Sequence, residues 1–551
     1  MKIIIIGGVI AGVETALQAR SNSETVDITI YDRDRDIAHT AYATHYVAGG
    51  IVKDVDQLTL NSPEWFKKRH NIDIHPNHDI LKVDYEAKKV YGVDTTNNIE
   101  FEDSFDVLVF ANGSSVTVPP VFRDKEFSNV FTIKSVQNAR NILSFIKDNK
   151  PKTAVVVGAG YIGLGVSEQL TNAGIKVQTV DFLEYPMAQL DPEMSIHIAD
   201  ILINNGVEFY GNEGVTELNF EADHLQSVTT SAGNICEADI LLVATGVRPN
   251  TELAESIGVE TGMSRAIKVN EKLETNLPNV YAVGDVAEGF HAVTKEPLYL
   301  PLAATAVKMG RAAGDIITGG VMRFNGVLGT SAVRLFGQTI ASTGMTESVA
   351  NKAGFDPVVS VENKPAVLEI MGGKDILIKA VADAKTDKLL GVEMIGPEGV
   401  ERRIDVFATA MQLGAKISDL LNLDLAFTPP ISTPTDPVVY TALSLERAIK
   451  NSPFITPEQL KEKMESNEDV TVVDVRDAKR YESNHIQGAI NIPIDELREN
   501  CGHLNKEDYI VVYCEDGEIS GTAQRILVNR EYTNVYNLSG GIENYQTQFE
   551  L

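Results

Sequence analysis

The 551-residue sequence has few cysteines and few basic residues, and each scarcity excludes classes of protein. Its three cysteines, Cys236, Cys501 and Cys514, provide neither a disulfide framework nor a zinc-ligand cluster. A formal net charge of −29 repels nucleic acids and anionic membrane surfaces. We therefore expect no metal site, no nucleic-acid partner and a reducing, cytoplasmic location.

Long apolar runs are also absent from the sequence. No run approaches the roughly 18–20 residues that cross a bilayer, so we expect no membrane partner. The apolar run at residues 1–6 is short and leads directly into Gly7 and Gly8, without a signal-peptide cleavage pattern. We interpret this run as a buried first strand. The chain length corresponds to about three or four domains.

A β-α-β pattern opens the chain. An expected strand at residues 3–6 leads through glycines into a helix at about 13–20, and a second strand at 27–31 ends at Asp32. The glycines are Gly7, Gly8 and Gly12. In such a unit the glycines let the backbone approach a pyrophosphate, and the terminal acid hydrogen-bonds ribose hydroxyls. The first copy therefore predicts a dinucleotide site.

The same pattern recurs further along the chain. A strand at residues 153–157 leads into a helix that ends near 173, and a strand at 176–180 ends at Asp181. The glycines of this copy are Gly158, Gly160 and Gly163. Asp181 would repel a 2′-phosphate, and residues 182–184 offer no cation to hold one. The second copy therefore favours NADH over NADPH.

Three further segments complete the pattern. Strands at 106–110 and 239–243 are each followed by small residues, and the third segment covers residues 275–285. The candidate binding positions in these segments are Ala111, Gly113, Gly246, Gly284 and Asp285. Together these segments resemble the two-dinucleotide-binding flavoproteins, which include the pyridine-nucleotide disulfide reductases. The resemblance covers residues 1 to about 447. It implies that Asp285 holds the ribityl chain of FAD and that the other segments cross between the FAD and NAD domains.

A narrower resemblance points to the branch of coenzyme A-disulfide reductases, persulfide reductases and NADH oxidases. It rests on residues 61–66, 397–405 and 429–437. The branch implies a homodimer formed through residues 321–447. For that region we expect strands at 366–371 and 389–395 and helices at about 400–413 and 435–449.

The chain departs from that branch where its redox cysteine belongs, because Tyr42 stands at this position. A thiolate attacks disulfides or adds to a flavin, whereas a phenol with a pKa of about 10 does neither usefully at neutral pH. We expect Tyr42 either to fill the space beside the flavin or to act as a gate or proton donor. Further departures are Ile10, Gly165, Phe427 and Ile431, where members carry His, Glu and two tyrosines.

Other side chains near these motifs are candidates for a role in the reaction. Tyr161 resembles the family tyrosine that covers the flavin until NADH displaces it; the alternative is ordinary packing. His39 and His45 flank Tyr42 and are candidates for delivering protons, although loop histidines are usually just solvated.

Residues 454–551 resemble a single rhodanese domain, through the segments 472–476 and 485–493. A strand at 509–513 ends at Cys514, and the loop that follows leads into a helix. Backbone N–H groups of such a loop stabilise a thiolate or persulfide, so Cys514 is the candidate sulfur carrier. The loop is acidic, which raises the pKa of the thiol and disfavours thiosulfate; its acids are Glu515, Asp516 and Glu518. We expect Cys236 and Cys501 to be non-catalytic.

The expected fold class is α/β, with two Rossmann-like dinucleotide-binding domains, an α+β dimerisation domain and a C-terminal α/β rhodanese domain. The expected limits are 1–120 and 250–320 for the FAD-binding domain, 121–249 for the NAD-binding domain, 321–447 for the dimerisation domain, 450–453 for a linker and 454–551 for the rhodanese domain.

The expected function is reduction of sulfane sulfur, a persulfide or polysulfide, by NADH through FAD, with Cys514 carrying the sulfur. One alternative is an NADH oxidase that makes hydrogen peroxide, because a reduced flavin open to solvent meets oxygen. A second alternative is a redox sensor that binds both cofactors and turns over slowly. Coenzyme A binding stays open, since Arg20 is the only basic residue on the first helix.

Overall fold

The computed structural model describes the chain except residues 60, 124, 450–452, 467–469 and 550–551 and the side chains of 41 and 42. The expected linker at 450–453 therefore lies almost wholly outside the described residues. The chain divides into two compact units. The first contains Met1–Pro186 and Leu202–Val327, and the second contains Met187–Ile201 and Leu328–Leu551.

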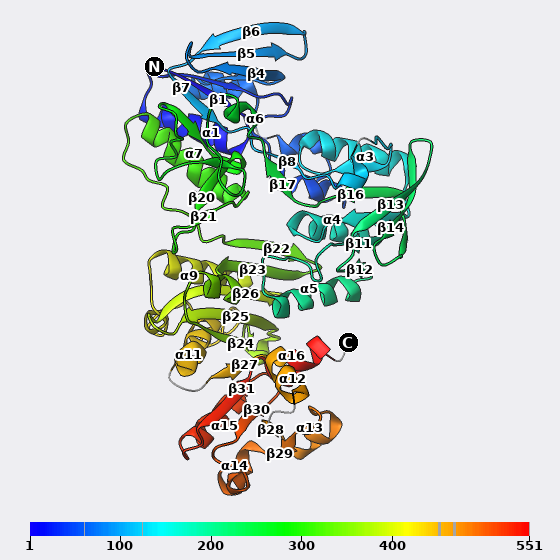
Figure 1. The fold of residues 1–551 in the computed structure, drawn as a ribbon, viewed down its shortest axis with the longest axis vertical. Helices are drawn as coiled ribbons and strands as arrows, with labels where there is room; N and C mark the ends of the chain where they lie inside the picture. Colours follow the sequence, from blue (N-terminus) through cyan, green and yellow to red (C-terminus); the bar gives the residue numbers. More distant parts are fainter. Residues whose placement is uncertain (60, 124, 450–452, 467–469, 550–551) are drawn as a thin grey trace. The chain divides into compact units, whose positions relative to one another are not determined.

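The first unit contains a five-stranded parallel sheet in the order β19-β7-β1-β2-β3. Its strands β1 and β7 are labelled in Figure 1. Its strands are β1 Lys2–Ile6, β2 Asp27–Tyr31, β3 Asp73–His75, β7 Val107–Phe110 and β19 Val280–Ala282. The N-terminal run is thus confirmed as a buried strand. Helices α1 (Ile10–Asn22) and α7 (Ala303–Ile317) pack closely, because a Cβ at Gly310 would lie only 2.6 Å from the carbonyl oxygen of Ala11.

A second parallel sheet of the first unit has the order β12-β11-β10-β16-β9. Its strands are β9 Val130–Thr132, β10 Thr153–Val157, β11 Lys176–Val180, β12 Glu208–Tyr210 and β16 Ile240–Val243, and its helices are α3 Val136–Asn149 and α4 Tyr161–Asn172. The strand–glycine–helix–strand order of β10, α4 and β11 confirms the second β-α-β unit.

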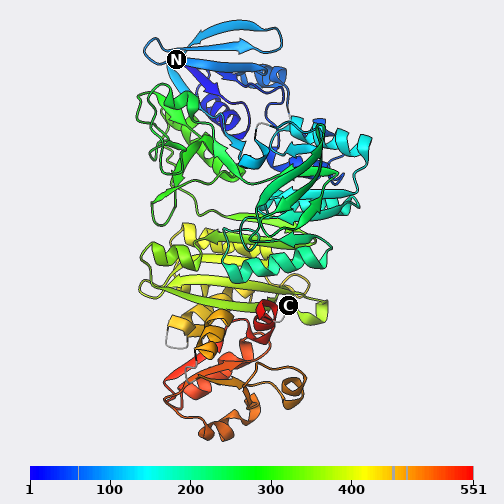
Figure 2. The same ribbon diagram turned by 45° about the vertical axis from the view of Figure 1, so that its right-hand side comes forward.

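Smaller elements surround these sheets, including an antiparallel sheet of β4 to β6 that Figure 2 shows in light blue. They are η1 Ala41–Val47, η2 Val55–Leu58, α2 Pro63–His70, β4 His78–Asp84, β5 Lys89–Asp94, β6 Ile99–Ser104, β8 Ser114–Val116, η3 Pro120–Phe122, β13 Val215–Glu221, β14 His224–Thr230, β15 Ile235–Glu237, β17 Val247–Pro249, α6 Glu252–Glu255, β18 Ile267–Lys268, η4 Gly284–Val286, β20 Ala287–Phe290 and β21 Pro297–Leu298.

The second unit contains an antiparallel sheet in the order β22-β23-β26-β25-β24. Its strands are β22 Ser331–Leu335, β23 Gln338–Gly344, β24 Pro357–Pro365, β25 Asp375–Asp383 and β26 Lys388–Gly396, and the associated helices are α8 Glu347–Lys352, α9 Val400–Gln412, α10 Ile417–Leu420 and α11 Pro437–Ile449. The strand expected at 389–395 and both expected helices are confirmed. The strand expected at 366–371 is wrong, because β24 ends at Pro365 and the chain turns through η5 (Glu369–Met371). Its apolar residues Ala366 and Val367 are buried in that turn rather than in a strand.

Helix α5 (Pro192–Asn204) lies mostly in the second unit, although its sequence falls within the expected NAD-binding range. The buried Lys379 of β25 forms an ion pair of 2.8 Å with Asp191 and another with Glu193. These ion pairs connect the start of α5 to the antiparallel sheet. Burial raises the pKa of the neighbouring Glu393 to about 8, so the cluster does not hold a full set of negative charges at neutral pH.

The C-terminal part of the second unit forms a parallel sheet in the order β27-β31-β30-β28-β29. Its elements are β27 Phe454–Ile455, α12 Pro457–Glu465, β28 Val470–Asp474, α13 Ala478–Ser483, β29 Ile490–Asn491, α14 Ile494–Asn500, η6 Cys501–His503, β30 Tyr509–Tyr513, α15 Glu518–Val528, β31 Asn534–Leu538 and α16 Gly541–Phe549. Cys514 follows the central strand β30 directly, so the sheet holds it at the carboxyl edge.

Candidate functional site

The glycine turn between β1 and α1 is too tight for side chains at two positions. Gly7 has a φ of +110°, and a Cβ there would lie 2.2 Å from the carbonyl oxygen of Ala111. A Cβ at Gly12 would lie 1.9 Å from the carbonyl oxygen of Gly7. Asp32 accepts a hydrogen bond of 2.6 Å from the backbone N–H of Gly8, and burial raises the pKa of its carboxyl. The turn, the helix start and the acid therefore meet at one edge of the sheet.

The turn between β10 and α4 repeats this geometry. A Cβ at Gly158 would lie 2.5 Å from the carbonyl oxygen of Ala244, and one at Gly163 would lie 1.8 Å from that of Gly158. Asp181 accepts a hydrogen bond of 2.5 Å from the backbone N–H of Ala159. A Cβ at Gly160 would meet nothing within 4 Å, so the turn faces open space where a pyrophosphate could approach. Both turns fit a dinucleotide.

The two crossover segments hold one another. The backbone N–H of Thr117 donates to the carbonyl oxygen of Gly246 (2.9 Å), and that of Asn250 donates to Gly113 (3.0 Å). Both glycines have positive φ, +88° and +64°. The side-chain oxygen of Asn112, between Ala111 and Gly113, is buried without a hydrogen-bond partner among the described residues. An acceptor in this position fits a site completed by a bound group.

Asp285 is oriented by two side chains that sequence reasoning did not identify. Its carboxylate accepts from Ser114 Oγ (2.9 Å) and from Lys134 Nζ (3.0 Å). The preceding Gly284 has a φ of +74° and packs against Ala11 in the first turn of α1. Asp285 thus lies near the first glycine turn, as a group that holds FAD would. The sequence gives no signal for Lys134, because it stands 151 positions from Asp285 in an ordinary polar segment.

The loop before η1 is anchored to α3 by ion pairs. Arg140 donates to both carboxylate oxygens of Asp36 (2.5 and 2.8 Å) and to Asp56 (2.8 Å). The Arg140 guanidinium holds the pKa of the Asp36 carboxyl below its usual range. His39 is buried, and its Nδ1 lies 2.8 Å from the backbone oxygen of Asp36. These contacts fix the entry to the segment that carries Tyr42.

His45, in η1, packs against Gly165 in α4. A Cβ at position 165 would lie 2.7 Å from Cδ2 of His45 and 2.9 Å from its Nε2. The imidazole is buried, its Nδ1 has no hydrogen-bond partner among the described residues, and burial lowers its pKa to about 4. The ring is therefore neutral at pH 7 and carries no extra proton to deliver. The interpretation of His39 and His45 as simply solvated loop residues is therefore wrong.

The remaining predicted residues take the following places. Tyr161 is the first residue of α4 and is half-buried. The side chain of Tyr42 lies outside the described residues, although η1 spans its position. Phe427 and Ile431 are 48% and 50% exposed, so neither belongs to the core of this chain.

The Cys514 sulfur lies inside the loop that precedes α15. It accepts hydrogen bonds from the backbone N–H of Gly517 (3.2 Å) and from Ser520 Oγ (3.3 Å). Its thiol donates to Asp516 Oδ1 at 3.4 Å. Burial and then Asp516 raise the pKa of the thiol, and Cys514 is 1% exposed. The loop presents donors suited to a thiolate or persulfide, while one carboxylate opposes the charge.

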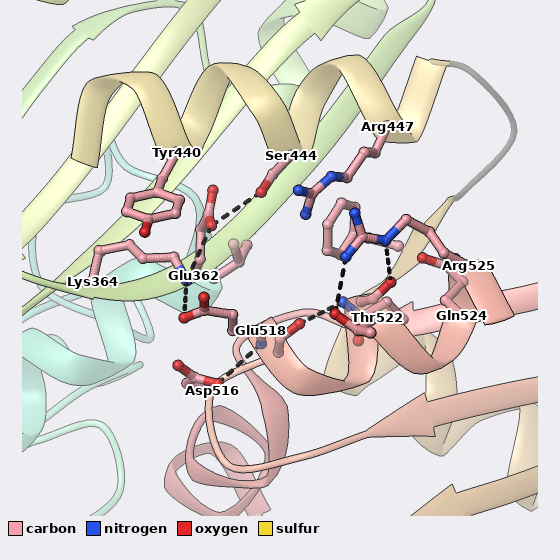
Figure 3. A pocket seen from close by; sticks show the side chains of 15 residues that line it. Glu362, Lys364, Tyr440, Ser444, Arg447, Asp516, Glu518, Thr522, Gln524 and Arg525 are labelled. Atoms are coloured by element: carbon pink, nitrogen blue, oxygen red, sulfur yellow. Dashed lines mark hydrogen bonds and ion pairs between the residues drawn. The ribbon is translucent and has the colours of Figure 1, made fainter. Parts of the chain in front are cut away.

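The other two acids of the loop are neutralised by cations. Glu515 is paired with Arg476 (3.2 Å) and Arg480 (3.2 Å). Glu518 is paired with Lys364 of β24 at 3.2 Å, as Figure 3 shows. The loop is therefore less acidic than its own sequence suggests, because the cations that pair with Glu515 and Glu518 come from distant parts of the chain. Asp516 is the acid that acts on the sulfur.

The other two cysteines are buried away from this loop. Cys236 is 0% exposed, and burial raises the pKa of its thiol to about 11. Cys501 accepts a hydrogen bond from Arg530 at 3.2 Å and is 2% exposed. Within the described part of the chain, no helix is both long and apolar enough to span a membrane.

The glycine turn occurs twice, each time with an acid at the end of the next strand and with a crossover segment. This arrangement defines a protein with two dinucleotide sites, and the same chain also carries a cysteine within a loop. The chain belongs to the pyridine nucleotide-disulphide oxidoreductase family, whose model matches residues 1–310. The dimerisation domain of the same family matches residues 330–437, and a rhodanese-like domain matches 456–548. The family uses FAD and NAD(P)H, and the geometry of both turns fits these cofactors.

Two solved structures match nearly the whole chain. The crystal structure of reduced CoADR-RHD from Bacillus anthracis is 30% identical, covers 99% of this chain and 98% of its own, and has a TM-score of 0.95. A NAD-dependent persulfide reductase from A. fulgidus is 32% identical, covers 99% and 100%, and has a TM-score of 0.90. An NADH oxidase from Methanocaldococcus jannaschii is 32% identical over 82% of this chain and 99% of its own.

Proposed function

We propose that this chain is an FAD-dependent NADH oxidoreductase that reduces sulfane sulfur. The overall reaction is NADH + H⁺ + RSSH → NAD⁺ + RSH + H₂S, in which the S–S bond breaks and both electrons come from NADH. One observation carries the proposal. The Cys514 sulfur accepts two hydrogen bonds within its loop, and this loop occurs in the same chain as two dinucleotide sites. The similarity to a persulfide reductase over the full length supports it.

The cofactor residues follow from the two turns. FAD, when bound, supplies two-electron chemistry between NADH and the acceptor. We assign its binding to the first turn with Asp32 and Asp285, and NADH binding to the second turn with Asp181. Tyr161, at the start of α4, would move aside to admit the nicotinamide. Tyr42 would close the acceptor side of the flavin in place of a thiol.

We also propose that the chain works as a homodimer with the domain limits given above. Residues 330–437 match a dimerisation domain, and the exposed Phe427 and Ile431 are apolar groups suited to such an interface. Light scattering at micromolar concentration should give twice the chain mass. A monomer would contradict this proposal.

A second candidate function is an NADH oxidase that forms hydrogen peroxide. It is favoured by Tyr42, because the segment that would carry a redox cysteine contains none. The similarity to an NADH oxidase also supports it. In this case Cys514 would serve a separate sulfur-transfer reaction.

NADH consumption under three conditions separates these functions. We expect the purified protein to be yellow with one FAD per chain, and a colourless protein after FAD addition would contradict both. Under nitrogen, a low-molecular-weight persulfide should accelerate NADH oxidation and release sulfide, and coenzyme A persulfide should be compared with glutathione persulfide. Fast oxidation only in air, with equimolar peroxide, would favour the oxidase. Slow oxidation under all conditions would indicate a cofactor-binding sensor.

A further inference from the structure

A cavity of ≈ 80 Å³ lies between β24, α11 and the start of α15 (Figure 3). Its charged side chains fall into two groups, one around Lys364 and one formed by Arg447 and Arg525. The first group contains the acids Glu362, Asp516 and Glu518. The arginines stand apart from it in Figure 3, with Ser444 and Thr522 nearby.

The acids of the lysine group are held by ion pairs and hydrogen bonds. The buried Lys364 is 3.2 Å from Glu518 and 3.8 Å from Glu362. Glu362 also accepts hydrogen bonds from Ser360 Oγ (3.2 Å) and Ser444 Oγ (3.0 Å). Asp516 accepts from the backbone N–H of Glu518 at 3.0 Å. Each of these acids therefore already has a partner within the protein.

The arginine group makes no direct contact with an acid among the described residues. Within that part of the chain, Arg525 donates only to the carbonyl oxygen of Gly521 (3.3 Å) and to Thr522 Oγ1 (2.9 Å), both on its own helix and both uncharged. For Arg447, the described residues provide no hydrogen bond or ion-pair partner. Burial and then the charge of Arg525 lower the pKa of Arg447, and the carboxylates Glu362, Glu518 and Glu446 oppose this in part. Both guanidinium groups therefore face the cavity with N–H donors that no carboxylate of the described residues contacts.

We propose that Arg447 and Arg525 form a binding site for a small dianionic oxyanion of the sulfate, thiosulfate or phosphate class. A guanidinium donates through a planar fork that matches two oxyanion oxygens, and a dianion offsets both charges. Arg525 is exposed, so the site is open to solvent on its side. Because Arg447 lies on α11 and Arg525 on α15, the bound ion would join the C-terminal domain to the helix that precedes it.

This site goes beyond the proposed reaction. Cys514 is not among the residues that line the cavity, and the loop residues shared by both sites are Asp516, Gly517 and Glu518. Binding of the oxyanion can therefore be measured without turnover, in protein that has not been given NADH. Failure of the sulfur reaction would leave this site untouched.

Isothermal titration of the full-length protein with sodium sulfate, phosphate or thiosulfate tests the proposal, with ionic strength held constant by chloride. We expect one saturable site per chain. Arg447→Gln and Arg525→Gln should each weaken binding by about tenfold or more, since each removes charge-assisted hydrogen bonds. Arg498→Gln, at an exposed position on α14, is the matched control and should bind as the native chain does.

Two outcomes would overturn the proposal: no saturable heat with any of the three ions, or unchanged affinity in both glutamine variants. Arg525 is exposed, so its substitution leaves the fold intact even where Arg447→Gln fails to fold. The melting temperature of the native chain should also rise with the ion that binds tightest. Tighter binding of thiosulfate than of phosphate would identify the natural ligand as a sulfur oxyanion. Tighter binding of phosphate would identify it as phosphate or a phosphorylated compound.

Discussion

The imidazole of His45 fills the space that a side chain at position 165 would need, because a Cβ on Gly165 would lie 2.7 Å from its Cδ2. Each of these residues departs from an ordinary expectation, one as a glycine inside a helix and the other as a buried loop histidine. The structure makes them a single feature that joins η1 to α4. A larger side chain at position 165 is therefore expected to be tolerated only when the side chain at position 45 is made smaller.

Gly165→Ala should destabilise the protein by about 1–3 kcal/mol, because the overpacked His45 ring cannot move freely. This cost exceeds the roughly 0.5–1 kcal/mol that Ala gains over Gly in a helix. In a His45→Ala background the same change should be neutral or stabilising. Urea unfolding of the four proteins measures the coupling. Gly502→Ala, where a Cβ meets nothing within 4 Å, is the control, and equal costs at 165 and 502 would contradict the overlap.

Burial of His45 should also make stability depend on pH. The ring has a pKa of about 4 in the folded chain and about 6.5 when unfolded. Between these values the unfolded chain binds more protons, so the contribution to stability is full above pH 6.5 and is lost as the pH falls toward 4. His45→Gln should remove this part of the dependence. Melting temperatures of both proteins from pH 4 to 8 measure it, and parallel profiles would show that His45 is not buried as a neutral ring.

The second turn should prefer NADH. A 2′-phosphate beside the Asp181 carboxylate should cost on the order of 1–3 kcal/mol. The carboxylate is already held by the backbone N–H groups of Ala159 and Leu183, so it cannot turn away without losing both bonds. Asp181→Ala should narrow the gap between the two coenzymes. Stopped-flow flavin reduction measures it, and equal or faster reduction by NADPH in the native chain would refute the preference.

Asp516 should control the ionisation of Cys514. Burial and this carboxylate raise the pKa of the thiol, so less of the thiolate is present at a given pH. Asp516→Asn should move the midpoint of Cys514 alkylation to lower pH, followed on the Cys514 peptide by mass spectrometry. Glu507→Gln, an equal charge change at an exposed position, should leave the midpoint in place. A similar shift in both variants would assign the effect to net charge instead.

Tyr42 should limit the flavin site to two electrons. A thiolate against oxidised flavin gives a long-wavelength charge-transfer band, and tyrosine provides no thiolate at neutral pH. Anaerobic NADH titration should therefore end at two electrons per FAD. Dithionite is the control, since bound NAD⁺ against reduced flavin gives a band of its own. Uptake of four electrons, or brisk reduction of coenzyme A disulfide by Cys514→Ser, would show that the redox centre lies elsewhere.

Local sequence patterns were sufficient for the sheets and their glycine turns. A strand, a glycine turn and a strand-end acid lie within about thirty residues, so Asp32 and Asp181 could be recognised without a fold. For Cys514, which directly follows a buried strand, the assignment came from the resemblance of residues 454–551 to a rhodanese domain. The prediction of a strand at 366–371 is wrong because a buried turn can have the same apolar sequence as a buried strand. Ala366 and Val367 are buried, yet their backbone has left the sheet.

Contacts between distant segments could not be predicted in the same way. Lys134 holds Asp285 from 151 positions away, and Lys364 neutralises Glu518 from 154 positions away. Gly165 and His45 are each noticeable in the sequence, but nothing there predicts that they pack together. Composition and spacing determined the cofactor turns and the sulfur loop of this protein, because those depend on neighbouring residues. The charge on the Cys514 loop, the neutral His45 and the meeting of Arg447 and Arg525 at one cavity were decided by the tertiary structure, because electrostatics and packing act through space rather than along the chain.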